Sequence, residues 1–201
     1  MDIILTTPHA HCPKDSKIRM CDIASSKSGD LFLDCCNKNG INSIYLKGNE
    51  YRYNWDLNRI ASRHTNFRKE LTKLLTGNNK PKILLDIHSF PNERIEEAGD
   101  INFFEKNEIA PDIVLLRGPS DIKFCNGKRK SICNELFSCL QTVKDIKIKI
   151  IDGITVNDIL NETHENDIPG ILIEINEKYD KDYKKLVPII DCIIKKVKEL
   201  L

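Results

Sequence analysis

The chain has 201 residues and a mass of 23.1 kDa, with 31 lysines and arginines, 30 aspartates and glutamates, and a formal net charge of +1. This length is typical of one compact domain, so we expect residues 1–201 to form a single domain around its own core. The near-neutral charge argues against nucleic acid as a partner. No apolar run approaches the roughly 20 residues that cross a bilayer, and the first residues lack the pattern of a signal peptide. We therefore expect a cytoplasmic protein without a membrane partner.

Short β-branched runs alternate with longer amphipathic runs, a pattern typical of an α/β fold. The last amphipathic run contains Pro188, which either begins or kinks its helix. In chain order, the pattern predicts a strand over 3–7, a helix over 29–38, a strand over 41–46, a helix over 66–75, strands over 82–87 and 112–116, a helix over 132–143, strands over 146–151 and 170–175, and a helix over about 183–201.

Two connections, 89–111 and 152–169, are longer than most connections in compact domains. Long connections of this kind are commonly binding loops. We therefore interpret both segments as candidate binding loops.

The eight cysteines form no C-x-x-C pair, so their spacing favours neither a zinc knuckle nor a dithiol redox site. Most of them lie in apolar runs, where a free cysteine behaves as a small hydrophobic residue. Without a secretion signal, we expect reduced thiols. The cysteines predicted to belong to the core are Cys35, Cys36, Cys133, Cys139 and Cys192.

Histidines and one carboxylate occur at or near the ends of predicted strands. His9 and His11 come directly after the first strand, and His88 follows the third. Glu174 lies inside the last apolar strand, where an ionised carboxylate needs a partner. Ligands bind beyond the carboxyl ends of strands in an open α/β sheet, so we expect these side chains to share one rim. Imidazoles with a carboxylate are the ligand set of a catalytic zinc ion.

An alternative interpretation of these residues needs no metal. A histidine near a strand end is often a hydrogen-bonded core residue, and Asp86 could orient the ring of His88. Glu174 could pair with a buried arginine or lysine. For each residue taken alone, both interpretations stay open.

A second polar group lies between positions 51 and 64 and includes Arg52, Arg59 and Arg63. A guanidinium presents two parallel donors that match a carboxylate, so this segment is a candidate site for the carboxylate of a substrate. The alternative is a solvated loop with a helix start at Asp56 or Asn58.

Four short motifs stand out along the chain. They are Thr7-Pro8-His9-Ala10-His11, Asp56-Leu57-Asn58-Arg59, Leu85-Asp86-Ile87-His88-Ser89 and Ile173-Glu174-Ile175-Asn176. In these motifs and their order the chain resembles the N-formylglutamate amidohydrolase family, which is itself similar to the zinc carboxypeptidases and aspartoacylases, although the sequence between the motifs is only weakly similar. The resemblance implies a three-layer α/β/α sandwich with a mostly parallel mixed sheet, as in zinc carboxypeptidases, and one zinc ion.

Carried over position by position, the resemblance makes His9 and His88 zinc ligands and Glu174 the general base. Asn58 and Arg59 match the pair that binds the free carboxylate of the substrate, and Arg59 would also orient the scissile bond. Arg63, in the same arginine-rich segment, is a further candidate for binding that carboxylate.

The third protein ligand stays open among four residues. Zinc carboxypeptidases have a glutamate three residues after the first histidine, where this chain has Cys12. In the formylglutamate family an acidic residue later in the loop takes this role, and Asp22 fits it best. Asp15, His11 and a thiolate at Cys12 are the rivals.

Together these residues predict a zinc-dependent amidohydrolase that uses metal-activated water. The expected partner is a small N-formyl or N-acyl amino acid with a free carboxylate, such as N-formylglutamate. One alternative is a carboxypeptidase-like zinc hydrolase acting on a peptide end. The other is a degenerate relative that binds a small carboxylate without hydrolysing it.

Overall fold

The computed structural model describes residues 1–12, 21–52, 54–93, 103–121, 131–152 and 157–201. In this part of the chain, six strands form one sheet in the order β2-β1-β3-β6-β4-β5. Only the pairing of β4 with β6 is antiparallel, and the other described pairings are parallel. The strands are β1 (Ile3–Thr7), β2 (Ser43–Lys47), β3 (Ile83–Phe90), β4 (Ile113–Arg117), β5 (Ile148–Asp152) and β6 (Gly170–Asn176).

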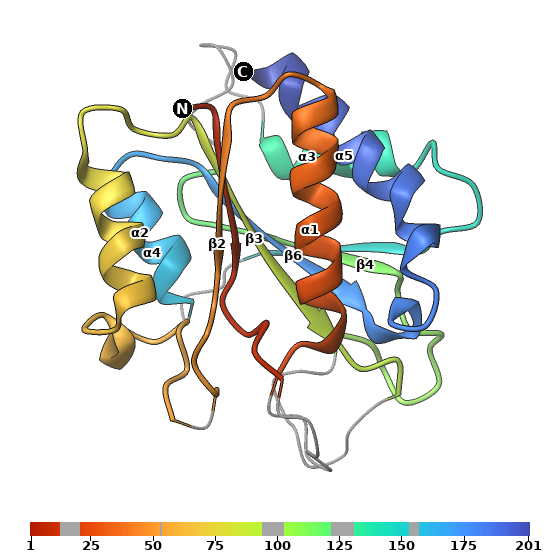
Figure 1. Ribbon diagram of the computed structural model, residues 1–201. Coiled ribbons are helices and arrows are strands. Elements are labelled where there is room, and N and C mark those ends of the chain that lie inside the picture. The colour runs from red at the N-terminus through yellow and green to blue at the C-terminus, as the bar shows by residue number, and fades with distance from the viewer. Residues whose placement is uncertain (13–20, 53, 94–102, 122–130, 153–156) are drawn as a thin grey trace.

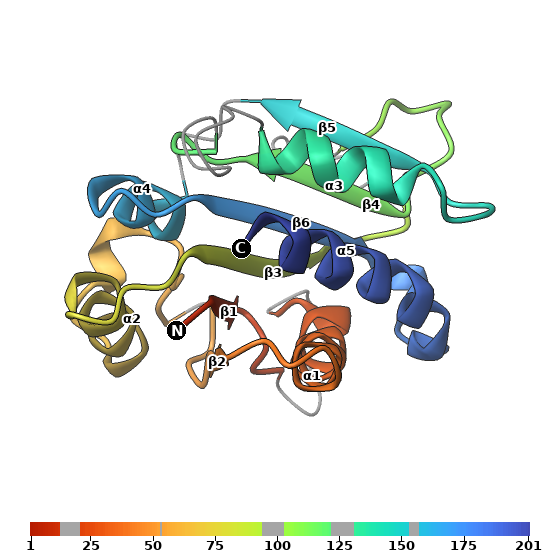
Figure 2. The same ribbon diagram turned by 90° about the horizontal axis from the view of Figure 1, so that it is seen from above.

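Helices cover both faces of the sheet (Figures 1 and 2). The first, third and fifth pack on one face, and the second and fourth on the other. The helices are α1 (Ile23–Lys38), α2 (Asn66–Thr76), α3 (Ile132–Leu140), α4 (Asp158–Glu165) and α5 (Val187–Leu200), with short 3₁₀ turns η1 (Ile60–Ser62), η3 (Glu177–Tyr179) and η4 (Tyr183–Leu186). The predicted α/β/α sandwich with a mostly parallel mixed sheet is confirmed. Among the described helices, none has both the length and the apolar character needed to cross a membrane.

Successive side chains along each strand point to opposite faces of the sheet, so the strands contribute to two separate cores. Ile3 and Leu5 of β1 point to the core under α1, α3 and α5, whereas Ile4 points to the core under α2 and α4. On β3, Leu84 lies on the α2 side with Ile4, and the side chain of His88, four residues on, points to the same face. The polar residues at the strand ends therefore lie on the face that α2 and α4 cover.

Several boundaries differ from the sequence prediction. Helix α1 begins at Ile23 rather than 29, because small residues such as Ala24, Ser25 and Ser28 are buried there and give no apolar periodicity. Pro188 lies in the first turn of α5, so it begins the helix rather than kinking it. The connection 152–169 is not one long loop, because it contains α4. In the connection 89–111, residues 94–102 lie outside the described part of the chain.

The expectation of reduced thiols is wrong for four cysteines. Cys12 pairs with Cys21 across a Cα–Cα distance of 5.2 Å, and Cys139 of α3 pairs with Cys192 of α5 across 6.2 Å. Both distances lie in the range that a disulfide bridges. Among the described residues, Cys35, Cys36 and Cys133 form no disulfide, and Cys125 lies outside the described part of the chain.

Candidate metal centre

Three side chains from three elements meet at the carboxyl end of β1 and β3. His9 follows β1, Asp22 is the N-cap residue of α1, and His88 lies within β3. One ligand atom from each lies within 4.8 Å of the others, and all three residues are buried. The structure thus brings together the two histidines and the acidic residue that the sequence analysis selected.

Both imidazoles turn the same ring nitrogen toward the carboxylate. His88 Nδ1 lies 2.7 Å from Asp22 Oδ2, and His9 Nδ1 lies 3.4 Å from the same oxygen. The two rings meet edge to face with centroids 5.0 Å apart. Two Nδ1 atoms and one carboxylate oxygen therefore converge on one point.

Outer carboxylates occupy the opposite side of each ring. His9 Nε2 lies 2.8 Å from Asp56 Oδ1, and His88 Nε2 lies 3.1 Å from Asp86 Oδ2. A carboxylate accepts a hydrogen bond from an Nε2–H group, which leaves the Nδ1 lone pair free for a metal. Asp86 orients His88, as the metal-free interpretation supposed, but the same contact is the usual support for a metal-bound histidine.

The donor set fits a zinc ion. Two imidazole nitrogens and one carboxylate oxygen are the ligands of a catalytic zinc site, which keeps one position for water or substrate. His9 Nδ1 is buried and makes no hydrogen bond within the described part of the chain. A buried polar atom without a partner costs free energy, and a bound cation would remove that cost.

The electrostatics of these residues also favour a cation. Burial acts to raise the pKa of Asp22, but the charges of His9 and His88 and the hydrogen bond to His88 lower it well below its ordinary value. Burial acts to lower the pKa of His88, yet the neighbouring Asp86 and Asp22 raise it well above 6.5. A positive charge at His88 would balance part of the charge of these two carboxylates, and a bound metal ion would supply positive charge at the same place.

A cavity of about 180 Å³ opens beside the three candidate ligands, and Glu174 lines it. Glu174 Oε2 is buried and has no hydrogen-bond partner among the described residues. Burial raises the pKa of Glu174 to about 8, and the charges of Asp22 and Asp86 act in the same direction. The alternative pairing of Glu174 with a buried lysine or arginine is not seen in the described part of the chain, and Glu174 lines the cavity instead.

The predicted carboxylate-binding residues divide into two groups. Asn58 and Arg59 line the same cavity, with Asn58 buried against His88 (Nδ2 to Nε2, 3.0 Å) and the Arg59 side chain half exposed. Arg63 does not line it. Its guanidinium donates two hydrogen bonds of 2.8 Å to Asp158.

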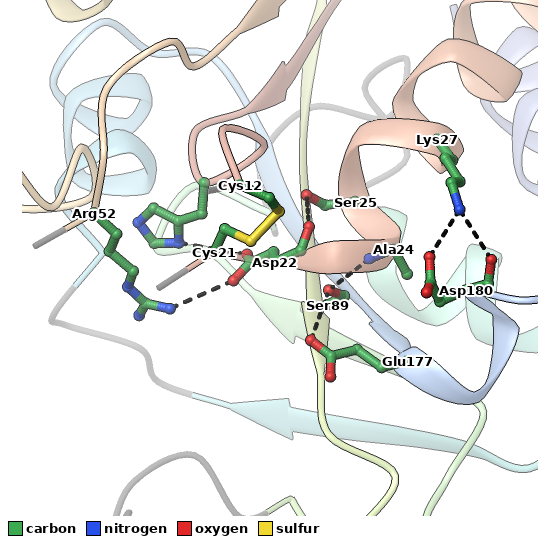
Figure 3. The surroundings of a disulfide bond; sticks show 11 residues. Cys12, Cys21, Asp22, Ala24, Ser25, Lys27, Arg52, Ser89, Glu177 and Asp180 are labelled. Atoms are coloured by element: carbon green, nitrogen blue, oxygen red, sulfur yellow. Dashed lines mark hydrogen bonds and ion pairs between the residues drawn. A yellow bond between two sulfur atoms is a disulfide. The ribbon is translucent and has the colours of Figure 1, made fainter. Parts of the chain in front are cut away.

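The structure describes two of the three rivals for the third ligand position, His11 and Cys12. The ring of His11 packs against Tyr51, with centroids 4.4 Å apart. A thiolate ligand at Cys12 is ruled out in this structure, because its sulfur is bonded to Cys21 immediately before Asp22 (Figure 3). Asp15 lies outside the described residues.

From the sequence, Arg52 was named only as part of the arginine-rich segment, and Asp56 and Asn157 were given no role at the metal centre. Arg52 lines the cavity and places Nη1 3.4 Å from Asp22 Oδ1 (Figure 3). Arg52 lies in the arginine-rich segment and Asp56 in the Asp56-Leu57-Asn58-Arg59 motif, so patterns already recognised in the sequence included both residues. Asn157 donates to Asp86 Oδ2 at 2.9 Å, but nothing local to its sequence marks it.

Comparison with known proteins shows the fold but no close relative. No family model and no curated protein matches the sequence. Among solved structures, N-acetylmuramoyl-L-alanine amidase from Clostridium difficile 630 is similar, with 16% identity and a TM-score of 0.59 over 98% of this chain and 95% of that chain. N-formylglutamate amidohydrolase from Ralstonia eutropha JMP134 has 11% identity and a TM-score of 0.58 over 100% and 94% of the two chains. The mDAP-bound D,L-carboxypeptidase Csd4 from Helicobacter pylori has 10% identity and a TM-score of 0.62 over 98% and 50%.

Proposed function

We propose that this protein is a zinc-dependent amidohydrolase that cleaves the amide bond of an N-formyl or N-acyl amino acid. One observation carries the proposal. His9, Asp22 and His88 converge on one point beside a cavity lined by Glu174, and Glu174 Oε2 has no hydrogen-bond partner among the described residues. Amidases and carboxypeptidases that share the fold support a reaction at an amide bond.

In the proposed reaction, some residues of this chain bind the metal and another transfers the proton. His9, Asp22 and His88 would hold the ion, which when bound polarises the scissile carbonyl and acidifies water. Glu174 takes a proton from the attacking water and returns it to the leaving nitrogen. Burial, which raises the pKa of Glu174, makes its carboxylate a stronger proton acceptor than an exposed glutamate.

Asn58 and Arg59 would bind the free carboxylate of the substrate. Both line the cavity, and the half-exposed Arg59 side chain places its Nε 3.4 Å from Asp56 Oδ2. A guanidinium that holds the carboxylate fixes the substrate at one end, so the amide is presented to the reacting groups in a defined orientation.

A carboxypeptidase-like hydrolase is the second candidate. The same residues would serve it, since a peptide end also carries a free carboxylate, and the fold is shared with a protein described as a D,L-carboxypeptidase. The two candidates differ only in what lies on the acyl side of the bond.

Metal analysis and a substrate panel test the proposal together. Protein expressed with added zinc should contain about one zinc ion per chain by elemental analysis. Formate or acetate release from N-formyl-L-glutamate and N-acetyl amino acids supports the amidohydrolase, whereas cleavage of short peptides alone supports the carboxypeptidase. Binding of these carboxylates without turnover would identify a non-catalytic binder. Absence of zinc, nickel and cobalt after supplemented expression would overturn both hydrolase proposals.

A further inference from the structure

Helix α2 contains a charged residue that is completely buried. Arg68 has an exposed fraction of 0%, and its Nη2 donates to Asp158 Oδ2 at 2.7 Å and to Glu162 Oε2 at 2.6 Å. Thr72 donates to the other oxygen of Glu162. Arg68 thus joins α2 to α4 through two carboxylates that lie about ninety residues away in sequence.

The other terminal nitrogen of the same guanidinium reaches the segment that carries the predicted carboxylate-binding pair. Arg68 Nη1 donates to the carbonyl oxygen of Leu57 at 3.0 Å and to that of Arg59 at 3.4 Å. The backbone N–H of Asp158 donates to the carbonyl of Asn58, the residue between them, at 2.8 Å. The carbonyl oxygens of residues 57–59 therefore all accept hydrogen bonds. Two of these bonds come from Arg68, and the third comes from Asp158, whose carboxylate accepts from Arg68.

The same turn of α4 also supports the metal centre. Asn157, the N-cap residue of α4, donates to Asp86 Oδ2, and that oxygen lies 3.1 Å from His88 Nε2. The residues at the start of α4 thus contact both the support of the metal centre and the segment that carries Asn58 and Arg59. Asn157 supports a histidine ligand, and Asp158 with Arg68 supports the segment of Asn58 and Arg59.

We propose that Arg68 is a positioning residue that fixes the backbone of 57–59, and so places Asn58 and Arg59 for binding the substrate's carboxylate. The inference rests on the proposed function for the identity of the ligand. A purely structural reason for the cluster is weaker, because buried ion clusters are often replaced by apolar residues without loss of stability. An arginine is required, because only its fork reaches two carbonyls and two carboxylates at once.

Hydrogen exchange tests the positioning without any substrate. Arg68→Met and Arg68→Lys are compared with Leu71→Ala, which removes a buried apolar side chain from the same helix but no hydrogen bond, since leucine cannot donate to the three carbonyls. Amide exchange over 56–60 should accelerate at least about tenfold in Arg68→Met, less in Arg68→Lys, and hardly at all in Leu71→Ala. Where Arg68→Met does not fold, Arg68→Lys carries the comparison. Equal exchange in the Arg68 variants and Leu71→Ala overturns the proposal.

Kinetics with N-formyl-L-glutamate test the consequence. Arg68→Met should raise KM by about tenfold or more with a smaller fall in kcat, at unchanged zinc content, and Arg68→Lys should recover part of the difference. Leu71→Ala should lower Tm and leave KM unchanged. A wild-type protein that neither binds nor hydrolyses this compound defeats the proposed function, whereas the exchange rates still decide the role of Arg68. A KM unchanged in both Arg68 variants of an active enzyme overturns that role.

Discussion

His88 of β3 and Glu174 of β6 are direct partners in the parallel pairing of the two strands. Side chains at paired positions point to the same face, and neighbouring strands lie about 4.8 Å apart. The register therefore places the proposed proton acceptor beside a proposed metal ligand and requires no loop to bring them together. Both strands are central in the sheet, so this arrangement rests on the most rigid part of the fold.

Glu174→Gln should separate metal binding from catalysis. The amide fills the same space but cannot take a proton from water, so we expect kcat to fall about a hundred- to ten-thousand-fold. Zinc content should stay as in the wild type, because Glu174 is not among the converging ligand atoms. The paired control is His88→Ala, which should lose the metal as well as the activity. Full activity in Glu174→Gln would remove the assigned base.

Asp56→Asn and Asp86→Asn should each weaken zinc binding without removing a ligand. The carboxylates accept from the Nε2 sides of His9 and His88, and outer partners of this kind are typically worth about ten- to a hundredfold in metal affinity. Competition with a chromophoric chelator measures the dissociation constant. Asp30→Asn, an exposed change on α1, is the control and should leave it unaltered. Wild-type affinity in both site variants would show that these contacts do not support a metal.

The fold and three residues of the candidate site could be predicted from the sequence because short stretches of sequence are enough to mark them. Apolar runs mark the strands, and His9, His88 and Glu174 lie at positions that any α/β sheet brings to one region. Asp22 was selected by resemblance, and its position as the N-cap of α1 was not foreseen, because the first turns of that helix are buried through small residues.

The supporting residues depend on contacts between distant segments, which no local pattern reveals. The partners of Arg68 are 90 and 94 positions away, so the sequence around Arg68 suggests an ordinary exposed helix position. Asn157 lies in a segment that was expected to be a loop. The disulfides are a similar case, since spacing alone does not determine which cysteines pair.

Removing the Cys12–Cys21 disulfide should weaken metal binding. Asp22 follows Cys21 directly, and its backbone N–H donates to the carbonyl of His9 at 3.0 Å, so the bridge restricts two ligands relative to each other. We expect the Cys12→Ser/Cys21→Ser protein to bind zinc about tenfold more weakly, because the freed segment loses entropy on binding.

The second disulfide supplies the matched control for that experiment. The Cys139→Ser/Cys192→Ser protein should also unfold at a lower temperature, since native disulfides typically contribute about 2–4 kcal/mol, but its zinc affinity should stay unchanged. Zinc affinities that fall equally in the two double variants would show a general loss of stability instead.

Gly48→Ala should disturb the metal centre through the backbone. A Cβ atom at Gly48 would lie 1.9 Å from the carbonyl oxygen of Pro8, the residue before His9. The chain must therefore shift at His9, and we expect weaker zinc binding by chelator competition. The control is Gly40→Ala, where a φ of +69° costs an alanine about 1–2 kcal/mol but where no atom lies within 4 Å of the new Cβ. It should lower Tm and leave zinc affinity unchanged, and a Gly48→Ala protein that behaves in the same way would contradict the prediction.

Asp158 should make the protein sensitive to acid. Burial acts to raise the pKa of Asp158, but hydrogen bonds from Arg63 and Arg68 outweigh it and hold the pKa below its ordinary value of 3.8. A carboxyl whose pKa is lower in the folded state stabilises that state above its unfolded pKa, and this stabilisation is lost as pH falls through the folded pKa. The free energy of unfolding should therefore decrease from about pH 5 downward.

Asp158→Asn tests this contribution because asparagine does not titrate. The variant should be less stable than the wild type at pH 7, since Arg63 and Arg68 each lose one of their charged partners. Between pH 5 and pH 3, however, it should lose less stability than the wild type loses. Urea unfolding at a series of pH values, followed by circular dichroism on metal-free protein, measures both quantities. Parallel stability curves for the two proteins would show that Asp158 does not titrate with folding, and that the Arg63 and Arg68 hydrogen bonds do not lower its pKa in solution.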